Sequence, residues 1–395
     1  MRFSRACIPL GYAWSSPFSR WQGALADLNS VDLAVLVTGR ALAERDLPAE
    51  AISQLVLGWT VPQKEIFYGA TTVAARLGAA GVTGPMIGQA CATSVACVQA
   101  AATAVDAGEE LALVVTTDRT SNGPHLVYPS PSGPGGMPET EDWVMDNFNR
   151  APWAGRPMIG TAEQVAAQEG ITRQECDAVT LLRYEQYQAA LAEDREFQRG
   201  WMVPVELPRR RGDPVVVDAD VGVFPTTAEG LAKLAPLDPH GVVTYGSQTH
   251  PADGTAGLVV TSEGRAREMG RGGVVRLLGS GMARVGKAEM AKAPVPAARA
   301  ALHAAGLGFT DLHAVVTHNP FAVNDIYFTR QTGYPLERMN TYGCSLVYGH
   351  PQGPTGARGI TELIHTLVRR GGGIGLFTGC AAGDTGAAVV LNVDG

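Results

Sequence analysis

The sequence lacks the long hydrophobic runs, the leader-like segment and the basic stripes that mark membrane, secreted and nucleic-acid-binding proteins. No apolar run approaches the ~20 residues that a membrane helix needs. The N-terminal segment MRFSRACIPLGYAWSS contains neither a long apolar region nor a clear cleavage site. The formal net charge is −7, and the densest basic cluster is the run of three arginines at 209–211. We therefore expect no membrane span, no signal peptide and no nucleic-acid partner.

Closely spaced cysteine pairs are also missing, although the chain has six cysteines. No Cys-x-x-Cys motif occurs among Cys7, Cys91, Cys97, Cys176, Cys344 and Cys380. This spacing argues against a zinc site or a disulfide scaffold, so we predict no metal site and a reducing, cytoplasmic compartment. The Gly-x-Ser-x-Gly turn of many serine hydrolases is absent as well. Most of the cysteines are expected to be small buried side chains, and a reactive one must be identified from its surroundings.

The composition is that of a folded globular protein. Hydrophobic residues make up 45% of the chain and charged residues 17%, which is too apolar for disorder. The length of 395 residues corresponds to two or three domains at ~150 residues each.

An internal duplication is the most informative feature of the chain. In each half a helix precedes a strand, a second helix follows, and a short strand and a Gly/Cys-rich turn lead into a long helix and a further strand. The expected helices lie at 31–44, 69–78, 93–107, 294–305, 322–333 and 355–370, and the expected strands at 54–60, 111–117, 312–318 and 375–378. A spacing of 34 residues separates Leu57 from Cys91 and also Val316 from His350. The matching order and spacing predict two similar α/β halves whose sheets are covered by helices.

The region between the halves has a different pattern. Residues 121–138 are rich in Gly, Pro and Ser and are expected to form a loop, whereas residues 161–198 have a helical pattern. Thr172 and Glu175 have the spacing of a capping box at the start of the second of these helices. We therefore divide the chain into an N-terminal half (1–117), an inserted loop domain (118–245) and a C-terminal half (246–395). Loops held by a rigid scaffold often build ligand sites.

Cys91 lies where a strand end meets the start of an Ala-rich helix, in the segment GQACATSVACVQAA. Backbone N–H groups and the positive end of a helix dipole would lower the pKa of a thiol there, as a nucleophilic cysteine requires. The alternative is a small residue that fills a tight turn. Cys97, six residues further along, is expected in the core.

His350 occupies the corresponding turn of the second half, in YGHPQGPTGARG. An imidazole at a helix entry could take a proton from a thiol. It could equally be a structural residue that caps the turn. A junction between the two halves would bring His350 and Cys91 into one cleft.

Three further polar residues follow strands of the second half. Cys380 lies in the Gly-rich segment GLFTGCAAGDTGAA, where it could shuttle protons or be a buried small residue. His318 and Asn319 end the strand at 312–318, and catalytic groups of α/β sheets often lie beyond the carboxyl ends of strands. The alternative for both is a polar cap on the strand.

Five sequence blocks, spread over nearly the whole chain, resemble the thiolase family. The most specific is GHPQGPTGAR at 349–358, which is similar to the family's GHPxGxTGAR. The others are ACATSVAC in the nucleophile region, MIGTAEQVA at 158–166, THPADGTAG at 249–257 and CAAGDTG at 380–386.

Several positions depart from the family pattern. HNPFA at 318–322 stands where many thiolases have NEAFA, and it is closer to the HDCF pattern of the sterol-carrier-type thiolases. Thr93 and Ser94 replace the usual Ser and Gly after the nucleophile. Ala382 replaces the first Gly of the C-terminal block; alanine keeps its N–H but disfavours a positive φ.

The resemblance implies the thiolase fold, an α/β fold in which duplicated βαβ halves form a five-layer αβαβα core, and it implies an acyl-enzyme. His350 would take the proton of Cys91, and the thiolate would attack a 3-ketoacyl-CoA. Cys380 would protonate the departing acyl-CoA or, in reverse, deprotonate acetyl-CoA for Claisen condensation. One oxyanion hole would use His350 with His318, and the other would use backbone N–H groups near Cys91 and Ala382.

The resemblance also implies the substrate contacts and the assembly. Asn319 and Gly383 would support the oxyanion sites. The residues expected beside the CoA thioester are Thr249, Met158 and Phe321. The aromatic residues expected around a roomy or aromatic acyl pocket are Trp143, Phe148 and Trp153. No cofactor would be bound permanently, CoA would be a substrate, and the chain would form a homodimer or homotetramer.

Two other functions remain open at this stage. The first is a condensing synthase of the thiolase superfamily, in which Cys91, His318 and His350 would form a Cys-His-His catalytic set. Such enzymes usually lack an equivalent of Cys380. A thiolase-like subunit that needs an accessory partner for activity is supported only by the unusual residues Ser94, Pro320 and Ala382.

Overall fold

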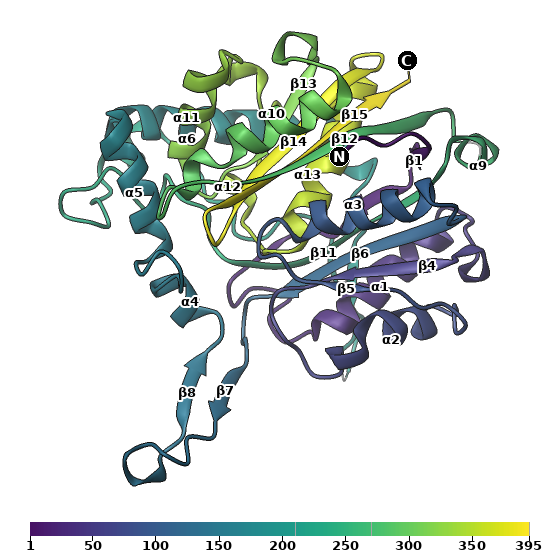
Figure 1. The fold of residues 1–395 in the computed structure, drawn as a ribbon, viewed down its shortest axis with the longest axis horizontal. Coiled ribbons are helices and arrows are strands. Elements are labelled where there is room, and N and C mark those ends of the chain that lie inside the picture. Colours follow the sequence, from purple (N-terminus) through teal and green to yellow (C-terminus); the bar gives the residue numbers. More distant parts are fainter. Residues whose placement is uncertain (210, 270, 395) are drawn as a thin grey trace.

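Two sheets alternate with three layers of helices in the computed structural model, which describes residues 1–209, 211–269 and 271–394 (Figure 1). The first sheet holds β11 (Ala252–Ser262), β6 (Leu111–Arg119), β4 (Gln54–Gly58) and β5 (Met86–Ile87), and the second holds β13 (Ala314–His318), β14 (Gly373–Ala381), β15 (Thr385–Val393) and β12 (Val274–Arg284). Strand β1 (Ala6–Pro9) pairs with both β11 and β12 and so joins the sheets. The predicted five-layer architecture is confirmed.

The helices form a middle layer and two outer layers. The middle layer is α3 (Thr93–Asp106) with α13 (Pro354–Arg369); the outer layers are α1 (Ser30–Ala43) with α2 (Gly69–Arg76), and α10 (Pro294–Ala305) with α11 (Ala322–Thr332). The predicted bounds agree with these within a few residues. One expected element is wrong: no strand in the described part of the second half matches β5, and only an isolated bridge joins Val315 to Met339.

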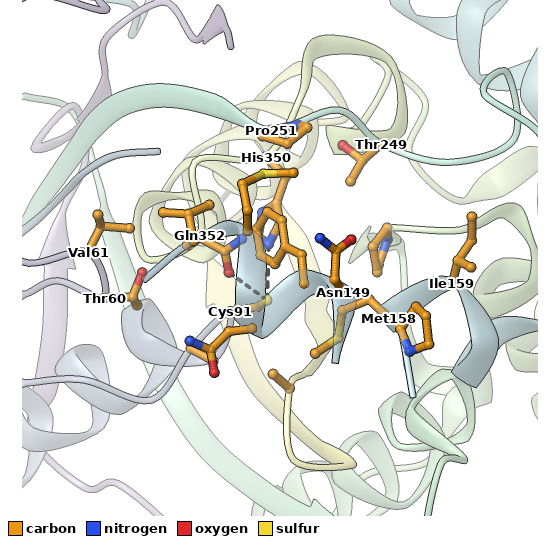
Figure 2. A pocket seen from close by; sticks show the side chains of 18 of the residues that line it. Thr60, Val61, Cys91, Asn149, Met158, Ile159, Thr249, Pro251, His350 and Gln352 are labelled. Atoms are coloured by element: carbon orange, nitrogen blue, oxygen red, sulfur yellow. Dashed lines mark hydrogen bonds between the residues drawn. The ribbon is translucent and has the colours of Figure 1, made fainter. Parts of the chain in front are cut away.

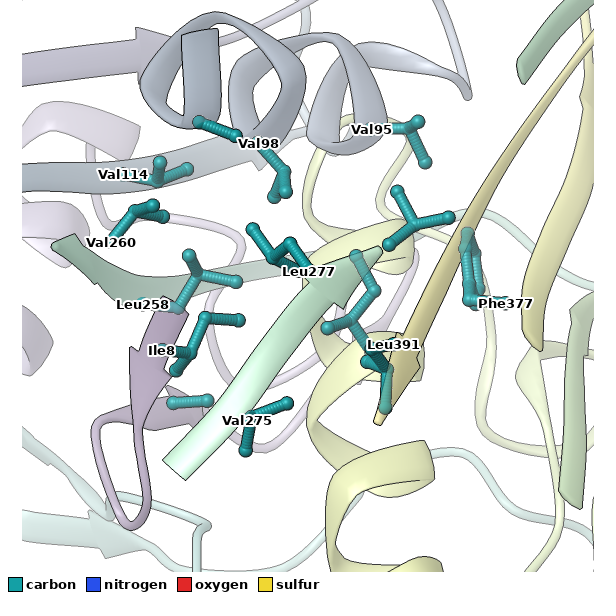
Figure 3. Packing of buried hydrophobic residues seen from close by; sticks show 14 of the residues in the cluster. Ile8, Val95, Val98, Val114, Leu258, Val260, Val275, Leu277, Phe377 and Leu391 are labelled. Carbon is teal, nitrogen blue, oxygen red and sulfur yellow. The ribbon is translucent and has the colours of Figure 1, made fainter. Parts of the chain in front are cut away.

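Helix α13 is buried on nearly every face, and α3 is buried on the faces that contact the sheets and α13. Small residues allow α3 and α13 to pack closely against each other. A Cβ at Gly356 of α13 would lie 2.8 Å from the Cβ of Ser94 on α3, so any larger residue there would push the helices apart. Figure 3 shows the apolar core between α3 and the sheets, where Val95 and Val98 pack toward Leu258, Leu277 and other sheet residues.

The inserted region contains a hairpin that the sequence did not predict. Strands β7 (His125–Tyr128) and β8 (Glu139–Asp142) pair antiparallel and extend away from the core (Figure 1). The expectation of a loop over 121–138 is therefore wrong for residues 125–128, which form β7. Four-residue strands joined by a Gly/Pro-rich turn are too short to show a clear alternation in sequence.

The helices of the insertion follow the prediction more closely. The predicted stretch 161–198 forms α5 (Met158–Glu169), α6 (Arg173–Ala190) and α7 (Ala192–Arg199), whereas α4 (Met145–Asn149) was not predicted. The capping box is confirmed: the Glu175 N–H donates to the Thr172 hydroxyl at 3.3 Å, and the Thr172 N–H donates to the Glu175 carboxylate at 2.8 Å. No helix among the described residues is long and apolar enough to cross a membrane.

Short elements complete the fold. The remaining strands are β2 (Ala13–Ser15), β3 (Ser19–Arg20), β9 (Val205–Leu207) and β10 (Val215–Val217); the remaining α-helices are α8 (Ala228–Ala232), α9 (Glu263–Glu268) and α12 (Ser345–Tyr348). The 3₁₀ helices are η1 (Ala49–Ala51), η2 (Ile66–Tyr68), η3 (Pro134–Gly136), η4 (Met290–Lys292), η5 (Phe309–Asp311) and η6 (Leu336–Arg338). The basic cluster at 209–211 includes Arg210, which lies outside the described residues.

A fully buried arginine ties the insertion to the C-terminal half. Arg358 of α13 donates to both carboxylate oxygens of Asp220, at 2.6 and 2.8 Å, and to Glu362 at 3.0 Å. Its guanidinium also lies 3.5 Å from the centre of the Tyr348 ring. Because a buried carboxylate needs a partner, this contact fixes the position of the insertion over α13.

Replacing Arg358 with methionine is expected to lower the free energy of unfolding by about 3–5 kcal/mol, because Asp220 would remain buried without its partner. Arg40→Met is the matched control. Arg40 pairs with Glu44 on the surface, where such a pair contributes about 0–1 kcal/mol. Urea unfolding of both variants measures the difference, and equal losses would contradict the structural role of Arg358.

Candidate active site

The junction between the two halves brings Cys91 and His350 together. Cys91 lies in the turn between β5 and α3, and His350 lies in the turn between α12 and α13. The Cys91 Sγ is 3.0 Å from the His350 Nε2, a hydrogen-bond distance for a thiol and an imidazole (Figure 2). Ala90 before the cysteine has a φ of +44°, so the turn that presents Cys91 is strained.

Two further contacts orient this pair. The His350 Nδ1 lies 2.6 Å from the Thr355 hydroxyl, which leaves Nε2 facing the sulfur. The Cys91 thiol can also donate to the Gln352 side-chain oxygen at 3.3 Å. Gln352 and Thr355 belong to the same turn as His350, so one short segment positions the imidazole and a second acceptor around the thiol.

Burial favours the neutral forms of both the Cys91 thiol and the His350 imidazole. Burial raises the pKa of Cys91 to about 12, and a hydrogen bond from the Ala382 backbone offsets this only partly. Burial lowers the pKa of His350 well below its usual value, and the adjacent His318 lowers it further. The predicted contribution of backbone N–H groups is present and lowers the Cys91 pKa, but the loss of hydration outweighs it, so the net shift of the pKa is upward. A neutral His350 is free to accept a proton.

We expect alkylation of free Cys91 by iodoacetamide to accelerate roughly tenfold per pH unit from pH 7 to 9, because the thiolate fraction rises with pH throughout that range. Mass spectrometry of quenched samples measures the rate at this residue. A cysteine peptide with an ordinary pKa of about 8.5 is the control, since its rate levels off within the range. A fast rate at Cys91 that is independent of pH would instead indicate a thiolate–imidazolium pair.

His318 lies beside this pair at the end of β13. Its ring stacks on that of His350, with centroids 4.0 Å apart and planes inclined by 29°. The His318 Nδ1 is 2.9 Å from the Ser345 hydroxyl, and its buried Nε2 has no hydrogen-bond partner among the described residues. Burial lowers the pKa of His318 to about 3, so this ring is neutral as well.

Cys380 is buried next to the same junction at the end of β14. Its sulfur accepts a hydrogen bond from the Asn324 side-chain amide at 3.3 Å. Burial raises the Cys380 pKa, and negative charge on Cys91 would raise it further. Sequence reasoning missed Asn324, because a polar residue in the first turn of a helix gives no sign of what it contacts.

The turn after Cys380 accommodates alanine without strain. Ala382 has no positive φ; the left-handed conformation falls instead on Gly383, with φ +84°, and on Asp384, with φ +58°. The backbone N–H of Ala382 faces the sulfur of Cys91. The substitution that departs from the family pattern therefore leaves this donor in place.

Asn319 does not face the reactive sulfur. Its side-chain amide donates to Asp325 at 2.7 Å, and Asp325 also pairs with the buried Arg183. Asn340 completes this polar group below the junction. Asn319 therefore helps to fix the turn that follows β13.

A cavity of about 950 Å³ opens in front of Cys91 and His350. The sequence-predicted residues that line it are Cys91, His350, Ala382, Thr249, Met158, Phe321, Trp143 and Phe148. In Figure 2, Thr60 and Val61 lie on one side of the sulfur, and Thr249, Met158 and Ile159 lie on the other. The cavity thus extends in two directions from Cys91.

Trp153 does not belong to this cavity, so the prediction that it helps to form an acyl pocket is wrong. Its side chain is 51% exposed. The Arg284 guanidinium lies 4.7 Å from its ring centre, a cation–π distance. Two of the predicted aromatic residues do line the cavity: Trp143, held by a hydrogen bond from its indole N–H to the Thr60 carbonyl, and Phe148. The other aromatic residues of its lining are Trp59, Tyr245 and Phe321.

This fold, with a cysteine and a histidine paired where two similar halves meet, is the arrangement expected of thiolase-like acyl-transfer enzymes. Family models agree: residues 12–264 match "Thiolase, N-terminal domain" and residues 274–393 match "Thiolase, C-terminal domain". The chain belongs to the thiolase family.

Relatives with assigned names are similar over their whole length. The chain is 30% identical to an acetyl-CoA acetyltransferase of Thiocystis violacea, covering 93% of this chain and 94% of that one. It is also 30% identical to a 3-ketoacyl-CoA thiolase of Escherichia coli O9:H4 (strain HS), covering 96% and 95%. The Bacillus anthracis acetyl-CoA acetyltransferase structure superposes with a TM-score of 0.92 at 28% identity over 99% of both chains. Human mitochondrial 3-ketoacyl-CoA thiolase in complex with CoA gives 0.91 at 25% identity over 100% of both chains.

Proposed function

We propose that this protein is a thiolase that cleaves a 3-ketoacyl-CoA with CoA, or catalyses the reverse Claisen condensation, through an acyl group carried on Cys91. The observation that carries the proposal is the 3.0 Å contact between the Cys91 sulfur and a neutral imidazole at the wall of a large cavity. Cys380 lies beside the same junction and adds a second thiol, which a one-way condensing enzyme would not need.

The first half-reaction forms the acyl-enzyme. As the Cys91 sulfur attacks the 3-keto carbon, its proton passes to the Nε2 of His350. When the bond between C2 and C3 breaks, its electron pair stays on C2 of the departing acyl-CoA, and Cys380 supplies the proton to that carbon. Before the second half-reaction, the proton held on His350 returns to the Cys380 thiolate, so both groups are neutral again. A CoA thiol then gives its proton to His350 and attacks the acyl-cysteine, and the departing Cys91 sulfur takes that proton back from His350.

Two groups of N–H donors support the developing oxyanions. If the His318 Nδ1 accepts from the Ser345 hydroxyl, its unpartnered Nε2 carries a hydrogen and can donate to an oxyanion beside His350. The backbone N–H groups near Cys91 and Ala382 serve the second oxyanion, and Gly383 allows the turn that aims them. Asn319 fixes the strand end that carries His318.

The inserted region and the start of the C-terminal half are proposed to hold CoA. Thr249 and Met158 line the cavity on the side away from Thr60, and Phe321 is also part of its lining. The similarity to a human thiolase solved with CoA supports this placement. In this proposal, the two halves at residues 1–117 and 246–395 supply the catalytic residues. The inserted domain at residues 118–245 covers the bound substrate. The segment HNPFA at 318–322 supports the further proposal that the protein is more similar to the sterol-carrier-type thiolases.

The proposal also covers the oligomeric state and the cellular compartment of the protein. We expect a homodimer or homotetramer with no permanently bound cofactor, because the family resemblance implies both. The six cysteines are free thiols in the described part of the chain, which supports a reducing, cytoplasmic compartment.

Intact-mass analysis after incubation with a panel of 3-ketoacyl-CoAs tests the proposal. We expect an acyl adduct that maps to Cys91 and disappears when CoA is added, with release of a shorter acyl-CoA. Failure to form any adduct would contradict the proposal. Activity that returns only with a co-purifying protein would favour the accessory-subunit alternative, and acylation without C–C cleavage would favour a condensing synthase.

A further inference from the structure

Three metal-ligating side chains converge at the junction of the two halves. One donor atom from each of Cys91, His318 and His350 can be chosen so that all three atoms lie within 4.8 Å of one another. Cysteine spacing in the sequence argued against a metal site, because it detects only ligands that are close along the chain. The three residues here are brought together from positions 91, 318 and 350 by the fold.

We propose that Cys91, His318 and His350 form a binding site for a thiophilic divalent cation of the Zn²⁺ class, and that the bound ion reversibly blocks the nucleophile. The inference goes beyond the proposed function and does not depend on which acyl group the enzyme transfers. It rests on the donor set, on the contacts that hold each donor, and on the open side of the site.

The contacts around the two imidazoles leave the same nitrogen of each ring available. The His350 Nδ1 is held by the Thr355 hydroxyl at 2.6 Å, and the His318 Nδ1 is held by the Ser345 hydroxyl at 2.9 Å. Histidines that bind metals usually engage their other ring nitrogen in such a contact, which fixes the ring. Each hydroxyl can also accept a hydrogen bond from Nδ1, and in that tautomer the Nε2 lone pair of each ring is free to bind an ion. The His318 Nε2 is buried and has no partner among the described residues, so an ion would satisfy it.

The donor set selects the ion by chemistry. A thiolate with two imidazoles suits Zn²⁺ and related ions such as Co²⁺, whereas Mg²⁺ and Ca²⁺ prefer oxygen ligands. Cys91 borders the cavity, which supplies a fourth position for water and a path of entry. Catalytic zinc sites commonly have this arrangement of three protein ligands and one open position.

Binding of the ion releases one proton, which comes from the Cys91 thiol. The ion takes the place of the thiol hydrogen on Cys91, so a metal–sulfur bond forms, the S–H bond breaks and the proton leaves to solvent. No electron transfer is involved. The sulfur lone pair is then engaged, and His350 no longer accepts a proton, so acyl transfer and alkylation at Cys91 should both stop until a chelator removes the ion.

Cobalt binding gives a readout that is independent of enzyme activity. We expect Co²⁺ to bind the purified full chain at one ion per chain, with a sulfur-to-cobalt charge-transfer band in the near ultraviolet and the visible bands of a tetrahedral ion. Cys91→Ser should lose the charge-transfer band, and His318→Asn should weaken Co²⁺ and Zn²⁺ binding by roughly tenfold or more. His303→Gln, at an exposed histidine on α10, is the matched control and should bind as the wild type does.

Protection of Cys91 from alkylation in the wild-type protein supplies a second test, which does not depend on whether a variant folds. Zn²⁺ should slow the alkylation of Cys91 by iodoacetamide, EDTA should restore it, and Mg²⁺ at the same concentration should have no effect. A charge-transfer band that survives Cys91→Ser, equal weakening by His303→Gln, or unchanged alkylation in the presence of Zn²⁺ would each overturn the proposal. These outcomes leave the thiolase function standing, since that is tested by the acyl adduct.

Discussion

Replacing Cys91 with alanine is expected to lower kcat for 3-ketoacyl-CoA cleavage by about 10⁴-fold or more. Nucleophilic catalysis divides the reaction through a covalent acyl-enzyme, and alanine leaves no atom to carry the acyl group. Cys380 is another thiol beside this junction, but it is buried and its sulfur accepts a hydrogen bond from Asn324. A continuous assay of 3-ketoacyl-CoA consumption measures the change, and the same variant should show no acyl adduct by intact mass.

Cys97→Ala is the matched control for this experiment. Cys97 lies on α3, the helix that follows the turn with Cys91. Its side chain is fully buried in the core and does not line the cavity. We expect its kcat to remain close to that of the wild type. Retention of more than a tenth of the activity in Cys91→Ala, or a comparable loss in Cys97→Ala, would argue against Cys91 as the nucleophile.

Replacing Cys380 with alanine should separate the two half-reactions. Cleavage or formation of the C–C bond needs a proton on or off C2, so we expect these rates to fall by about 10²–10⁴-fold. Transfer of an acetyl group between acetyl-CoA and free CoA needs only Cys91 and His350, and it should persist within a few-fold. Isotope-labelled CoA follows this exchange, while the 3-ketoacyl-CoA assay follows the C–C step.

Asn324→Leu gives a graded version of the same test. The Asn324 amide donates to the Cys380 sulfur, and such a bond favours the charged thiolate. We expect a loss of roughly tenfold in the C–C step, with acetyl exchange unchanged. If exchange and C–C cleavage fell together in either variant, Cys380 and Asn324 would be structural supports for the junction and not a proton carrier with its positioning residue.

The sequence predicted most elements of the core because their signals are local. α10 is observed with the predicted bounds, Pro294–Ala305, and the capping box of Thr172 and Glu175 forms as expected. Both depend on contacts within a few residues of chain, which periodicity and spacing record directly. The β7–β8 hairpin was missed, since its pairing joins short strands across a turn that has the composition of an irregular loop.

By itself, the sequence determined the duplicated α/β architecture and the two turns that carry Cys91 and His350, because repeated order and equal spacing survive in one dimension. Only the tertiary structure decided their chemistry. The distance from sulfur to imidazole, the stacking of His318 on His350 and the contact of Asn324 with Cys380 join residues from distant segments. Burial of these groups reversed the expected direction of the Cys91 pKa, because the hydration of a charge depends on everything packed around it and not on its neighbours in the chain.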